Sequence, residues 1–94
     1  MILEKKDVQF FTVTESKTSN QVVLHLKGLV MHSSMGISKV DQISDQNNYV
    51  ILVHLVLARR GVDGNMNFEI NVPSNVDTVL FGNTHEIIWK RDHN

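Results

Sequence analysis

Short runs of apolar residues, separated by polar and glycine-containing breaks, make up most of the chain. Residues 21–27 alternate apolar and polar positions, and residues 66–72 do so again. A period of two indicates a β-strand with one face in the core and the other in water. No stretch of helix length carries the i, i+3, i+4 and i+7 spacing more strongly, so the pattern predicts an all-β protein.

We expect about seven strands. They cover residues 8–14, 21–27 with a continuation at 29–32 after Gly28, 37–43, 49–59, 66–72, 76–81 and 86–91. Residues 49–59 are apolar on both faces, which predicts a central strand covered on both sides. In residues 86–91, Ile87 and Trp89 are expected to share a face.

The segment at residues 37–43 allows two interpretations. Its apolar residues recur every three positions, as they would along one side of a short helix. The polar cluster at residues 45–48 instead favours a bulged strand joined by a hairpin turn to the next strand. A second hairpin tip is expected at residues 82–84.

Seven short strands at regular spacing are typical of an antiparallel, immunoglobulin-like β-sandwich, and a small β-barrel is the alternative. The length of 94 residues suits a single domain. We expect residues 1–6 and 92–94 to be flexible.

The end of the chain resembles the closing strands of small bacterial immunoglobulin-like domains found in uncharacterised cell-envelope proteins and lipoproteins. The matching segments are FEINVPSNVDTVLFG at residues 68–82 and IIWKR at residues 87–91, and GISKV at residues 36–40 is similar to the middle hairpin of those domains. The resemblance implies a sandwich in the cell envelope and no shared catalytic residues. Such proteins usually carry a signal peptide and often a lipidated cysteine, which this sequence lacks. We therefore expect a periplasmic or envelope location if a targeting segment was removed, and a cytoplasmic one otherwise.

Composition excludes several functional classes. Nine Lys and Arg against ten Asp and Glu leave no positive excess to hold nucleic acid or an anionic membrane. The basic pairs at residues 5–6, 59–60 and 90–91 are interpreted as solvated strand ends. Without cysteine there is no disulfide, thiolate metal site or cysteine nucleophile. The longest apolar run, residues 49–58, is too short to span a bilayer as a helix.

Candidate catalytic and metal-binding residues lack the spacing that their chemistry requires. The histidines His25, His32, His54 and His85 have no tight ligand spacing, although His25 and His54 are expected in mid-strand as possible cross-strand neighbours. Residues 32–36 lack the first glycine of a nucleophile elbow, and residues 61–64 form a turn. Glu69 and Glu86 are interpreted as solvated charges on polar strand faces. The three aspartates Asp41, Asp45 and Asp63 lack the spacing of a calcium-binding loop. We expect no enzyme activity, metal or cofactor.

Apolar residues at positions expected to face outward are the main functional signal. They exceed what one inner face requires, which indicates either a second layer at the end of the core or a surface for association. The predicted binding residues are Phe11, Val23, Val79, Phe81 and Ile88, with Val13 as a further outward apolar residue. We expect a non-enzymatic binding or structural module that engages a protein partner or a second copy through a sheet face or an edge strand. The alternative is a small-ligand or carbohydrate-binding sandwich with a cleft near Tyr49 and Trp89.

Overall fold

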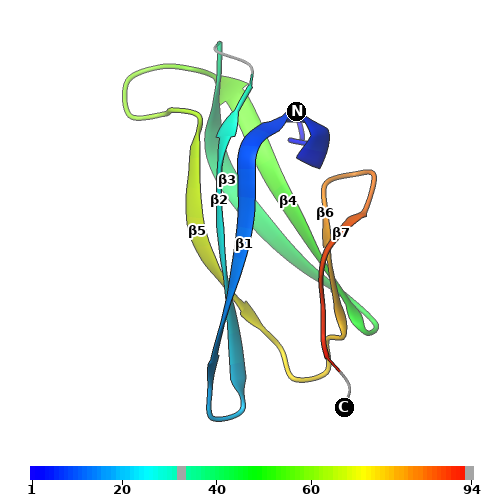
Figure 1. Ribbon diagram of the computed structural model, residues 1–94. Coiled ribbons are helices and arrows are strands. Elements are labelled where there is room, and N and C mark those ends of the chain that lie inside the picture. The colour runs from blue at the N-terminus through cyan, green and yellow to red at the C-terminus, as the bar shows by residue number, and fades with distance from the viewer. Residues whose placement is uncertain (32–33, 93–94) are drawn as a thin grey trace.

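The structure is a computed structural model that describes residues 1–31 and 34–92. It consists of one 3-10 turn and seven strands. These are η1 (Lys5–Asp7), β1 (Val8–Thr18), β2 (Gln21–Val30), β3 (Met35–Asp45), β4 (Asn48–Leu57), β5 (Asn65–Val72), β6 (Thr78–Phe81) and β7 (Glu86–Lys90). Figure 1 shows β1, β2 and β5 side by side, with β3 and β4 crossing them and β6 and β7 at the other end of the second sheet.

The strands form two sheets, in the orders β1-β2-β5 and β3-β4-β6-β7. The all-β sandwich of seven strands is thereby confirmed, and the sheets do not close into the alternative barrel. One pair departs from the expected antiparallel pattern, because β4 and β6 run parallel. The chain makes the necessary crossover through β5, which lies in the opposite sheet.

Residues 37–43 lie in a strand with a bulge, as the hairpin interpretation predicts. The register of β3 against β4 shifts between Ile37 and Lys39, and a turn with Gln46 at positive φ joins the two strands. Gly28 lies within the unbroken strand β2, where a Cβ would collide with the side chain of Val8. Close strand packing, rather than a chain bend, therefore explains this glycine.

One cluster of buried side chains lies between the sheets. The fully buried members are Leu3, Leu24, Leu26, Ile51, Val53, Met66, Ile70, Val76, Val79 and Phe81. Met66, Ile70 and Val72 are buried while Asn67 and Glu69 are exposed, which confirms the alternation expected for residues 66–72.

The expectation that residues 1–6 are a flexible extension is wrong. Leu3 is 1% exposed and belongs to the core, and its N–H donates to the carbonyl of Val53 at 2.9 Å. The N–H of Leu55 donates to the carbonyl of Met1 at 2.7 Å, so residues 1–3 pair with β4 beyond the end of β6. Residues 93–94 of the expected flexible tail lie outside the described residues.

Val79 and Phe81 do not face outward as the sequence analysis expects. Both are 0% exposed, because their register opposite Tyr49 and Ile51 of β4 turns them toward the core. The ring of Phe81 meets that of Phe11 edge-on, with centroids 5.4 Å apart.

Bulges also reverse the expected faces of residues in β1 and β7. In β1 the register shifts between Gln9 and Thr12, so Phe11 and Val13 pack against the core. In β7 the shift leaves Ile88 as the extra residue, and Ile88 also packs against the core. Ile87 opposes Leu80 while Trp89 opposes Val79, so Ile87 and Trp89 lie on opposite faces rather than sharing one.

No helix in residues 1–31 and 34–92 has the length and apolar character needed to cross a bilayer.

The position of Phe81 predicts a large stability cost for its truncation. Phe81→Ala should lower the free energy of unfolding by about 3–5 kcal/mol, measured by chemical denaturation, because it leaves a cavity between the sheets. If that variant does not fold, Phe81→Leu should still lower it by about 1 kcal/mol. The control Ile87→Ala, at a half-exposed site, should cost less than Phe81→Ala. A near-neutral Phe81→Ala would contradict this placement.

Candidate protein-binding face

A row of four apolar side chains crosses the outer face of the β3-β4-β6-β7 sheet. Ile43 pairs with Val50, Val50 with Leu80, and Leu80 with Ile87, so each strand contributes one residue. Residues paired in this way point to the same side of a sheet. We call Ile43, Val50, Leu80 and Ile87 the outer row.

The outer row faces away from the core. In β4 the alternate residues Ile51, Val53 and Leu55 belong to the core cluster, which leaves Val50 on the opposite face. Val50 is only 6% exposed and yet lies outside that cluster, so neighbours on the outer face bury it.

The two ends of the outer row are open to solvent. Ile43 is 46% exposed and Ile87 is 51% exposed, one on each edge strand of the sheet. Leu52, the next outward residue of β4, is half-buried and extends the apolar surface. Apolar residues grouped on one face, with both ends of the group exposed, are a feature of interaction sites, whereas single exposed apolar residues are ordinary.

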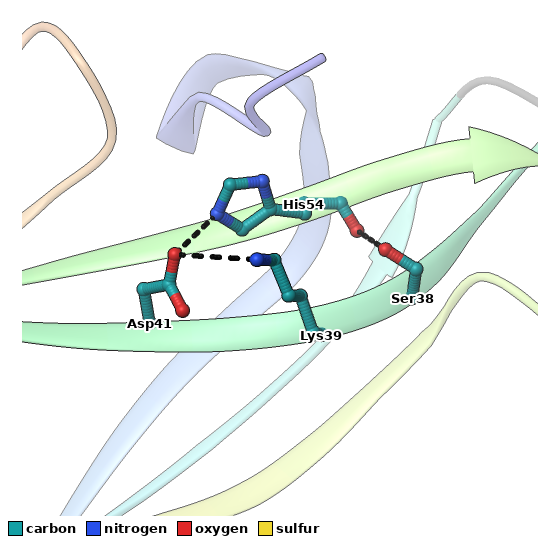
Figure 2. A network of polar contacts seen from close by, with 4 residues as sticks. All are labelled: Ser38, Lys39, Asp41 and His54. Atoms are coloured by element: carbon teal, nitrogen blue, oxygen red, sulfur yellow. Dashed lines mark hydrogen bonds and ion pairs between the residues drawn. The ribbon is translucent and has the colours of Figure 1, made fainter.

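A polar cluster bounds one side of the outer row (Figure 2). The imidazole Nε2 of His54 lies 2.7 Å from Oδ2 of Asp41, and Nζ of Lys39 lies 3.9 Å from the same oxygen. The hydroxyl of Ser38 donates to the backbone carbonyl of His54 and not to its ring. The polar groups of the cluster therefore contact one another and do not form a serine–histidine–aspartate triad.

Opposite charges bound the other side. The next row on the same face consists of Asp45, Asn48, Thr78 and Lys90, which we call the end row. Asp45 lies on β3 and Lys90 on β7, at opposite edges of the sheet. Three strand spacings of about 4.8 Å place them about 14 Å apart, too far for an ion pair within one chain. Among the ion pairs within the described residues, none includes Asp45 or Lys90.

The outer face of the β1-β2-β5 sheet has a different character. Its outward positions on β5 are polar, and Val23 is a half-buried apolar residue there, outside the core cluster as expected for an outward position. A shallow open hollow near one end is lined by Phe10, Thr12, Lys27, Gly28, Leu29, Asn65, Met66 and Asn67. Phe10 is 74% exposed at the β1 bulge, with φ of 57°. The hollow includes neither residue of the expected cleft, Tyr49 or Trp89.

Trp89 is held by contacts on both its polar and its aromatic surfaces. Its Nε1–H donates to Oε1 of Glu15 at 2.5 Å, and the guanidinium of Arg91 lies over the ring, 5.3 Å from the centroid. The hydroxyl of Tyr49 donates to Gln42 at 3.0 Å. The Trp89 indole N–H and the Tyr49 hydroxyl, which the ligand-binding alternative places near a cleft, therefore have partners within the chain.

The other candidate residues do not come together. His25 lies in β2, where its Nε2 contacts Oδ1 of Asn67 at 2.5 Å, whereas His54 lies in the opposite sheet, so the expected neighbourhood is wrong. Glu69 and Glu86 are exposed on different sheets. In the part of the chain that the structure describes, no three potential metal ligands gather. His32 and Ser33 of the expected elbow lie outside that part.

The contact between Glu15 and Trp89 predicts a pH-dependent fluorescence signal. The Trp89 N–H holds the pKa of Glu15 below its usual value, against a slight burial effect and with help from Lys17 and Arg91. The stabilisation from this contact is therefore fully present above the unfolded-state pKa, and it is lost as the pH falls through the lower folded-state pKa, where Glu15 becomes protonated in the folded chain. Because the chain has one tryptophan, its emission should change with a midpoint below the ordinary glutamate value.

Glu15→Gln should remove that transition, and Glu69→Gln on the other edge of the same sheet should leave it in place. A transition that persists in Glu15→Gln would show that another group controls Trp89.

Comparisons with protein-family models, with curated proteins and with solved structures found no significant match to this chain. The resemblance to bacterial immunoglobulin-like domains therefore stays a prediction.

Proposed function

We propose that this protein is a non-enzymatic binding module that engages a protein partner through the outer face of its β3-β4-β6-β7 sheet. The observation that carries the proposal is the outer row, which is apolar on every strand and half-exposed at both edges. Burial of apolar surface is the main favourable term in protein association.

A sheet face suits this function better than an edge strand. Three of the four edge strands carry a bulge: β1 near Phe10, β3 near Ser38 and β7 at Ile88. Bulges twist an edge and interrupt the backbone groups that an added strand would pair with. Association through the face requires no free backbone groups and uses the side chains that are already exposed.

A non-enzymatic role agrees with the polar chemistry on this face. The imidazole of His54 is paired with Asp41, and the nearby hydroxyl of Ser38 is directed to a backbone carbonyl. A partly exposed contact of this kind is worth little energetically, and the imidazole has no hydrogen bond from the Ser38 hydroxyl that would activate this hydroxyl as a nucleophile.

The resemblance to bacterial immunoglobulin-like domains adds an envelope setting to the proposal. An immunoglobulin sandwich consists of two antiparallel sheets. The parallel pair of β4 and β6 departs from that topology, so the proposal uses the sandwich architecture and not a family-specific site.

Site-specific photo-crosslinking tests the proposal in the native cell. A photoreactive amino acid in place of Ile87 should crosslink to a polypeptide, because Ile87 lies at the exposed end of the outer row. The matched control places the same amino acid at Glu69, an exposed position on the opposite sheet, and should give no such product.

The crosslink at Ile87 should also be lost in an Ile43→Asp background, because a buried unpaired carboxylate at the other end of the row opposes docking. Folding is checked by the emission of Trp89. Equal crosslinking at Ile87 and Glu69, or a product that survives Ile43→Asp, would overturn the proposal.

A further inference from the structure

We propose that the partner on this face is a second copy of the same chain, arranged about a two-fold axis parallel to the strands. The inference rests on the proposed function and adds the identity of the partner. It is carried by the order of charges and apolar residues across the outer and end rows.

The pairing of the strands fixes what such an axis brings together. The axis lies between the two facing sheets and runs parallel to their strands. Rotation about it reverses the order of the strands across the sheet, while each row keeps its position along the strand direction. It places β3 opposite β7 of the second copy, and β4 opposite β6. In the outer row, Ile43 then faces Ile87, and Val50 faces Leu80, so the exposed apolar side chains at both ends of the row are covered, while Val50 is already buried within each copy.

The same rotation pairs the charges of the end row. Asp45 of each copy faces Lys90 of the other, because these residues lie on β3 and β7 at the same level. Each residue is exposed, and within one chain the two are about 14 Å apart. Facing sheets pack about 10 Å apart, a gap that an aspartate and an extended lysine bridge together. The contact is therefore self-complementary, as a two-fold interface requires.

The polar cluster on the other side of the outer row places no unpartnered aspartate against the second copy. Oδ2 of Asp41 contacts Nε2 of His54 and Nζ of Lys39 within the chain, so this carboxylate already has partners before a second copy docks. The dipole between Asp45 and Lys90 is the part of the face that selects the orientation, since the opposite strand order would set like charges against each other.

The size of the face sets the expected affinity. Four strands and about five residues along each strand give a footprint of about 19 Å by 17 Å, or about 320 Å² on each copy, which is below the size of stable specific interfaces and in the range of weak, transient ones. We therefore expect a weak dimer with a dissociation constant of about 100 micromolar or more, detectable by analytical ultracentrifugation of the full chain over a concentration series that reaches the millimolar range.

Charge reversal provides the decisive experiment. Lys90→Asp alone sets Asp45 against the new aspartate in both contacts, and Asp45→Lys alone sets lysine against Lys90. Each variant should dimerise at least about tenfold more weakly than the wild type at low ionic strength. The double variant with both changes should recover the wild-type constant, because the pairs are restored with exchanged signs.

Mixing the two single variants should give a heterodimer in preference to either homodimer, measured by native mass spectrometry with one variant isotope-labelled. The matched control Glu69→Lys changes a charge on the opposite sheet and should leave the wild-type constant unchanged. All substituted sites are exposed, and Trp89 emission checks that each variant is folded.

Three outcomes overturn the inference: a wild-type chain that remains monomeric throughout, a dimer insensitive to either charge reversal, or mixed variants that form no excess of heterodimer. If the chain is monomeric while the Ile87 crosslink joins a different protein, the second-copy arrangement is wrong and the proposed function stands. If the Ile87 crosslink is also absent, both are wrong.

Discussion

The first residues of the chain hold the two sheets together, and the rest of the sandwich depends on this connection. Residues 1–3 pair with β4, and the same segment continues into β1 of the opposite sheet. Between them, the carboxylate of Glu4 accepts hydrogen bonds from the backbone N–H groups of Asn83 and Thr84 and from the Thr84 hydroxyl, which fixes the β6–β7 turn.

Burial of Glu4 acts to raise its pKa, but these hydrogen bonds and Lys6 outweigh that effect and hold the pKa below its usual value. Gly82 completes the contact, because a Cβ there would collide with the Glu4 carboxylate. In a chain without cysteine, this junction serves the purpose that a disulfide serves in other small sandwiches.

The local sequence pattern predicts where the strands lie. It does not predict which sheet face a side chain points to in a strand that contains a bulge. A period of two assigns faces correctly along β5, where apolar and polar residues alternate without interruption. In β7 one extra residue, Ile88, turns Trp89 to the core side and leaves Ile87 outside. The β1 bulge does the same for Phe11. A single inserted residue reverses every later assignment in a strand, and its position is set by contacts with the partner strand rather than by local composition.

The outer row was hidden for a related reason. Val79, Leu80 and Phe81 are all apolar, so alternation cannot say which of them faces the core. The register of β6 against β4 decides it, and this is a parallel pairing between segments far apart in the sequence. The sequence did contain one usable signal. Residues 49–59 are apolar on both faces, and the structure confirms that β4 lies inside its sheet. An apolar central strand requires cover on both faces, which is what the pattern of residues 49–59 predicts, but this pattern does not identify the neighbouring residues of the outer row.

One chain meets only half of this requirement. The β1-β2-β5 sheet covers the inner face of β4, while the described strands all belong to the two sheets and supply no third layer over Leu52 and the outer row. Val50 is nevertheless almost completely buried by its outward neighbours, so the surface is packed before any partner arrives. A preformed surface loses little conformational entropy on docking, which favours association even where the footprint is small.

Apolar rows of this kind can bind many partners, and opposite charges at the two edges of the sheet restrict binding to a partner surface whose charges have the complementary order. A second copy of the chain has that complementary order when it is rotated about an axis parallel to the strands. The outer row would then provide the apolar contact, and the charges of the end row would favour a second copy over other partners.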